Sequence, residues 1–191
     1  MTNNPTWWEE WFTQWKNWLI PRAARAEKYG VEMLVLYLYP DVDSFQSDVY
    51  SQYGDRCREI ITEVRNVYSG MVALNVINAD ERLTFADELD ALLITVFGGL
   101  YTSSGRLKDV RNSTMQELVN ITEDYLDMAQ NFAGKLPIYY VLTISSSDGQ
   151  QASEDPEWLL AREKGLDFQE QVLYYEAFFK ALEDESWISG V

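Results

Sequence analysis

The residues of this sequence that could do acid–base chemistry follow its apolar segments. Asp41 and Asp43 come just after the first such segment, which ends at Tyr39, and Asp148 follows the fourth. Carboxyl and phenol groups can give and take protons in a reaction when their pKa values suit the working pH. The alternative for Asp41 and Asp43 is a turn that caps the next helix, and for Asp148 an Asp-Gly turn.

Several other kinds of site are excluded by composition. Histidine is absent and cysteine occurs once, at Cys57. A Ser-His-Asp triad, a histidine-bearing zinc site, an internal disulfide and a CxxC redox pair are therefore excluded. The acidic loop Glu154–Glu157 lacks the spacing of an EF-hand, and no dinucleotide or Walker motif is present. The sequence predicts no metal site and no cofactor.

Residues that could hold a ligand also lie at the ends of apolar segments: Asn75, Asn78, Phe97, Tyr101 and Ser145. Asn75 lies inside an apolar run, so its amide must find a partner or point into a polar opening. Phe97 and Tyr101 could stack on a ligand, although Phe97 also suits a core position. Ser145 opens a serine-rich loop, and such loops can bind anions through backbone N–H groups.

The elements that must position these residues alternate between helix and strand. Helices are predicted over residues 6–29, 44–68, 108–133 and 166–183, with a short helical piece at 84–90. Apolar strands are predicted over residues 31–39, 71–77, 91–97 and 137–144, and a fifth strand begins at 187–191. Thr6 is the expected N-cap of the first helix, Pro21 is expected to kink or divide it, and Gly30 to end it.

Alternation of this kind predicts a single α/β domain over residues 1–191 with a parallel sheet. Two architectures fit. One is a (β/α)₈ barrel of which the chain supplies about five βα units. The other is a complete, open, doubly wound sheet of five parallel strands. In both architectures the site lies at the carboxyl ends of the strands.

Several segments, in order, match one group of barrels. The segments read A-x-x-x-G-V-E before the first strand, V-R-x-x-Y-x-G before the second and L-D before the third, then K-x-P before the fourth and Q-x-x-x-Y-x-A-x-x-x-A with W-I-x-G at the end; they occupy residues 26–32, 64–70, 89–90, 135–137, 171–181 and 187–190. On these residues the chain resembles the glycoside-hydrolase-like TIM barrels related to endo-mannanases, strands four to eight.

The resemblance implies a carbohydrate ligand and a pair of catalytic glutamates. Those glutamates would fall at Tyr39 and near Leu142, and neither position holds a carboxylate. The resemblance therefore implies either a degenerate, sugar-binding member or a hydrolase in which other carboxylates act. In the second case we expect Asp41 or Asp43 to work with Asp148. Tyr39 could instead serve as nucleophile, as tyrosine does in sialidases.

Two functions of other classes remain open. The chain could be a non-enzymatic assembly module, since five strands leave an open edge that a partner chain or a second copy would cover. It could also be a flavodoxin-like domain that binds a small ligand.

The charge and hydropathy of the chain limit the kinds of partner it is expected to bind. With 15 Lys and Arg against 31 Asp and Glu, the net charge is −16, which argues against binding to nucleic acid or anionic membranes. The longest uncharged apolar run, residues 91–101, is too short to span a bilayer. No signal peptide is evident, so the expected location is the cytoplasm, or outside the cell if the chain is a fragment of an exported precursor.

Tryptophan is concentrated at the start of the chain. Five of the seven tryptophans lie between Trp7 and Trp18, at helical spacing. We expect them to pack the first helix against the sheet, the alternative being a platform for a carbohydrate or a partner.

Overall fold

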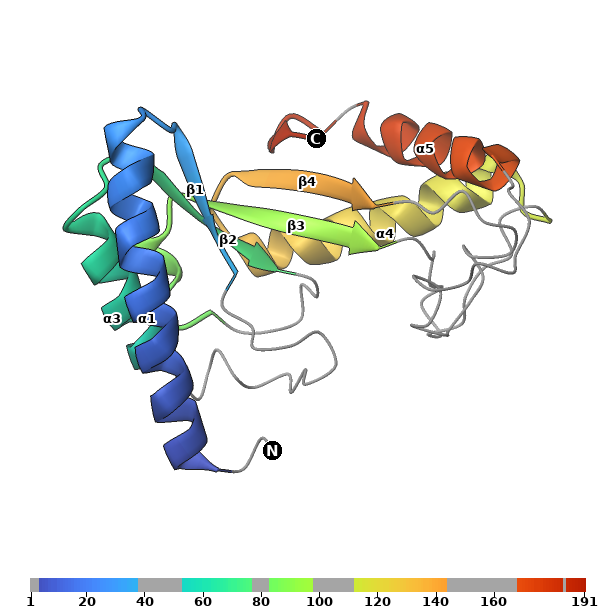
Figure 1. Ribbon diagram of the computed structural model, residues 1–191. Coiled ribbons are helices and arrows are strands. Elements are labelled where there is room, and N and C mark those ends of the chain that lie inside the picture. Colours follow the sequence, from blue (N-terminus) through green and yellow to red (C-terminus); the bar gives the residue numbers. More distant parts are fainter. Residues whose placement is uncertain (1–3, 38–52, 77–82, 98–111, 144–167, 184) are drawn as a thin grey trace. The chain divides into compact units, whose positions relative to one another are not determined.

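The computed structural model describes residues 4–37, 53–76, 83–97, 112–143, 168–183 and 185–191. The helices are α1 (Pro5–Lys28), α3 (Gly54–Arg65), α4 (Met115–Ala133) and α5 (Phe168–Leu182), with a 3₁₀ turn η2 (Ala86–Glu88). The strands are β1 (Met33–Leu36), β2 (Met71–Val76), β3 (Ala91–Phe97), β4 (Ile138–Thr143) and β5 (Ile188–Gly190). Figure 1 shows the helices and strands alternating along the chain, as predicted. None of the described helices is long and apolar enough to cross a membrane.

The sheet has the strand order β1-β2-β3-β4-β5. The first three strands are parallel, with Val35 opposite Ala73 and Ala73 opposite Ala91. An open doubly wound sheet reverses its strand order at a switch point, whereas a barrel adds each new strand beside the last. The order has no reversal, so it contradicts the flavodoxin-like alternative and agrees with the barrel.

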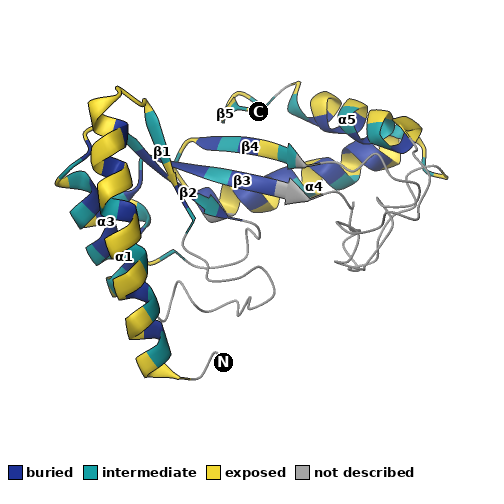
Figure 2. Cartoon of the chain, viewed as in Figure 1, coloured by how far each residue is buried: buried dark blue, intermediate teal, exposed yellow. Residues whose placement is uncertain are grey.

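The chain forms two compact units. The first comprises residues 1–94 and 132–138, and the second residues 95–131 and 139–191. In the first unit, α1 and α3 cover one side of β1 and β2 (Figure 1). Six strand residues on that side are fully buried: Leu36, Val72, Leu74, Val76, Leu92 and Ile94. Figure 2 shows the same buried band along β2 and β3.

The amino-terminal cap of helix α1 differs from the sequence prediction. Its N-cap is Asn4, whose Oδ1 accepts hydrogen bonds from the backbone N–H groups of Thr6 and Trp7 at 3.1 and 3.4 Å. Thr6 is therefore not the cap, because an Asx side chain two residues earlier already satisfies these donors. Pro21 lies inside α1 without dividing it.

Gly30 ends α1 as predicted. Its φ is +65°, and the N–H groups of Gly30 and Val31 donate to the carbonyls of Glu27 and Ala26 at 3.1 and 3.0 Å. This is a Schellman motif, which needs a left-handed residue just past the helix. The A-x-x-x-G-V-E segment therefore encodes a helix stop and the turn into β1.

Replacing Gly30 with Ala should lower the free energy of unfolding by about 1 kcal/mol, the cost of a left-handed backbone for a residue with Cβ. No atom lies within 4 Å of the position of the new Cβ, so no steric cost is added. Urea denaturation of both proteins measures the difference. An unchanged midpoint would show that the left-handed turn does not restrain the native chain.

Candidate functional site

The amino ends of β2 and β3 are joined by an ion pair between Arg65 and Asp90. The Arg65 guanidinium lies 2.6 Å from the Asp90 carboxylate and also donates to the carbonyls of Gly70 and Glu88. The same Asp90 oxygen, Oδ2, accepts the backbone N–H of Val72 at 2.7 Å. The pair thus satisfies backbone groups at the start of both strands, which the ladder alone leaves unpaired.

A buried tyrosine holds the amino end of β1 to that of β2. The Tyr68 hydroxyl donates to the carbonyl of Val31 at 2.8 Å, and its side chain is only 2% exposed. Gly70 lies against this ring and against the carbonyl of Glu32. Burial raises the pKa of the Tyr68 phenol, so it remains a donor at neutral pH.

These two clusters contain four of the residues that carry the resemblance in the first unit. Arg65, Tyr68 and Gly70 belong to V-R-x-x-Y-x-G, and Asp90 to L-D. All lie at the amino ends of the strands, where barrels are stabilised rather than active. These motif residues therefore stabilise the amino ends of the strands and do not form the carboxyl ends, where a site is expected.

On the face of the sheet that α1 and α3 do not cover, a row of half-buried side chains lies toward the carboxyl ends of the strands. Asn75 is paired in register with Leu93 of β3, and Tyr37 follows Leu36 as Asn75 follows Leu74. Tyr37, Asn75 and Leu93 are each half-buried. Because side chains alternate along a strand, the row lies one layer above Val35, Ala73 and Ala91. We call Tyr37, Asn75 and Leu93 the strand-end row.

The strand-end row combines groups suited to a polyhydroxylated ligand. The Asn75 amide offers both donor and acceptor atoms, and the Tyr37 phenol offers a donor. Burial raises the pKa of Tyr37, which keeps this phenol protonated at neutral pH. Sequence reasoning identified Asn75 but missed Tyr37. Tyr37 could have been found from the sequence, because it lies two residues before Tyr39 and residues two apart on a strand share a face.

Most of the other predicted site residues lie outside the described part of the chain. This applies to Tyr39, Asp41, Asp43, Asn78, Tyr101, Ser145 and Asp148, whose proposed roles stay predictions. Phe97 ends β3, as predicted, but only its backbone is described. Leu142 is half-buried in β4, a strand that contains no carboxylate.

The second unit contains a cluster of buried aromatic rings. Tyr140 of β4 lies 5.5 Å from the ring of Phe178 of α5 and 6.5 Å from that of Tyr125 of α4. Burial raises the pKa values of Tyr125, Tyr140 and Tyr174 far above the ordinary range, so none can act as a base near neutral pH. The Tyr140 ring packs between the helices as core.

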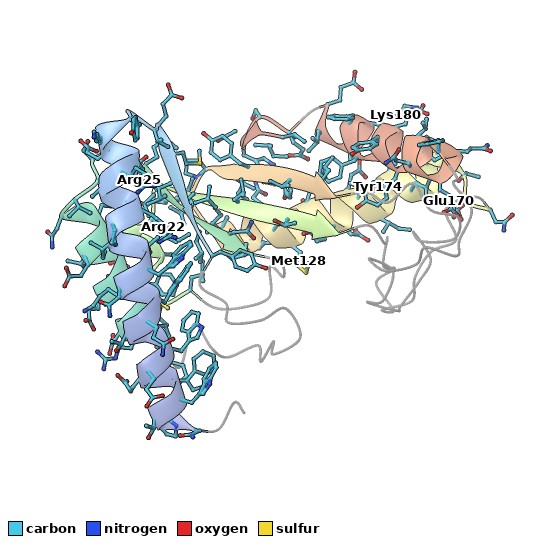
Figure 3. All side chains as sticks on the ribbon, viewed as in Figure 1. Arg22, Arg25, Met128, Glu170, Tyr174 and Lys180 are labelled. Carbon is cyan, nitrogen blue, oxygen red and sulfur yellow. The ribbon has the colours of Figure 1, made fainter. Side chains whose placement is uncertain are left out.

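Glu170 is a buried carboxylate that sequence reasoning missed. It lies in the first turn of α5 and is 2% exposed (Figure 3). The positive end of the helix dipole favours a carboxylate at that place.

Among the described residues, no three of the types Asp, Glu and Cys are grouped closely enough to hold a metal ion.

Comparison with known proteins places these features in one family. The family model described as Glycoside Hydrolase Family 113 matches residues 1–191. The chain is similar to a solved complex of a β-1,4-mannanase of that family, with 26% sequence identity and a TM-score of 0.71. The match covers 100% of this chain and 53% of the mannanase chain. A second β-1,4-mannanase structure is 24% identical with a TM-score of 0.67 and the same coverage.

A third solved structure extends the agreement. The β-mannanase AaManA from Alicyclobacillus acidocaldarius, in complex with ManMIm, is 21% identical with a TM-score of 0.65, and covers 96% of this chain and 50% of its own. No curated protein compared with the chain matches it. The chain thus spans about half the length of the solved structures it matches, and the predicted barrel-like α/β fold is confirmed over that half.

Proposed function

Because the chain belongs to glycoside hydrolase family 113, we propose that it binds a β-1,4-linked mannose oligosaccharide at the carboxyl ends of its strands. The match of the family model to the whole chain carries this proposal. The substrate class comes from the solved relatives, which are β-mannanases. The strand-end row, with the Asn75 amide beside the Tyr37 phenol, supplies hydrogen-bonding groups at the end of the sheet where barrels hold their ligands.

We propose that binding occurs without hydrolysis. The resemblance would put the two catalytic glutamates at Tyr39 and near Leu142. A retaining glycosidase needs two carboxyl groups about 5–5.5 Å apart on either side of the bond. Strand β4, where the second glutamate would lie, contains no carboxylate. This supports binding without hydrolysis. Asp41, Asp43 and Asp148 remain the carboxylates that would act if the chain does hydrolyse a glycan.

At one hundred times its Kd, mannohexaose should raise the melting temperature of the chain by about 5–11 °C. A ligand at one hundred times its Kd contributes about 2.7 kcal/mol to stability. Replacing Asn75 with Ala should weaken binding about tenfold, the loss of one hydrogen bond of ordinary strength. Isothermal titration calorimetry measures the affinity, and a reducing-sugar assay tests for hydrolysis.

The matched control is Asn17→Ala, which removes an exposed amide on α1 away from the sheet and should leave affinity unchanged. Circular dichroism of both variants separates lost binding from lost folding. Absence of any shift with mannose, glucose and xylose oligomers, together with no sugar release, would overturn the proposal. Sugar release that is lost in Asp41→Asn, Asp43→Asn or Asp148→Asn would show that the chain is a hydrolase.

A further inference from the structure

We draw no further inference here: the strongest candidate, the surface patch on α1 where Trp18 is 46% exposed, contrary to the prediction that it packs against the sheet, and where the Arg22 guanidinium lies 3.8 Å from the Trp18 ring, carries none, because nothing in the structure shows what covers it and the chain spans about half the length of the solved structures it matches.

Discussion

Replacing Gly70 with Ala should lower the free energy of unfolding by about 3 kcal/mol. The new Cβ would lie 2.5 Å from Cζ of Tyr68, closer still to its hydroxyl, and 3.0 Å from the Glu32 carbonyl. The ring is buried and cannot swing away without breaking its hydrogen bond to Val31. Overpacking in a filled core costs about 1–3 kcal/mol, and the lost hydrogen bond about 1 kcal/mol more.

Thermal unfolding measures this effect as a fall in melting temperature of about 6–12 °C. Gly30→Ala is the matched control, because it adds the same methyl group where no atom lies within 4 Å. The loss at Gly30 comes from its left-handed backbone, which Gly70 does not adopt, so the larger loss at Gly70 is steric in origin. Equal losses at Gly30 and Gly70 would show that the Tyr68 ring moves aside freely, against its role in joining β1 to β2.

Replacing Asp90 with Ala should lower the free energy of unfolding by about 2 kcal/mol. One carboxylate oxygen accepts both the Arg65 guanidinium at 2.6 Å and the Val72 N–H at 2.7 Å. Val72 is fully buried, so its amide is left without this partner inside the protein. An unsatisfied buried amide costs about 1–3 kcal/mol. Asp90→Asn keeps an acceptor for Val72 and should cost less.

Asp87→Ala provides the control for Asp90→Ala. Asp87 also pairs with an arginine, Arg58, at 2.8 Å, but its side chain is 71% exposed. Exposed ion pairs contribute about 0–1 kcal/mol. Urea denaturation of the three variants should therefore rank Asp90→Ala well below Asp90→Asn and Asp87→Ala. A loss at Asp87 as large as at Asp90 would mean that surface charge, not strand anchoring, dominates this end of the sheet.

The elements of the fold were predictable because their signals are local. The apolar runs at 71–76, 91–97 and 138–143 form strands, and Gly30 ends α1 where a left-handed residue is required. The cap at Asn4 was missed because Thr6 and Glu9 also have the spacing of a capping box, and only the backbone geometry decides between the two.

The candidate site was harder to predict for a physical reason. A ligand site depends on which strands are neighbours and in what register, and Tyr37 joins Asn75 only through the pairing of β1 with β2. The exposure of Trp18 has the same origin. Periodicity puts it near the buried residues of α1, but how far the core extends around a helix depends on which neighbours are present on each flank.

The anchoring of the strands at their amino ends has a consequence for how such a chain changes over generations. The groups that hold β1, β2 and β3 in place, among them Arg65, Tyr68 and Asp90, lie at the amino ends of the strands, opposite to the end proposed to bind the ligand. A substitution that removes a catalytic carboxylate at the other end leaves this framework untouched and relieves the repulsion between two neighbouring negative charges. Selection for folding alone would thus preserve the motifs that identify the family while the chemistry drifts away.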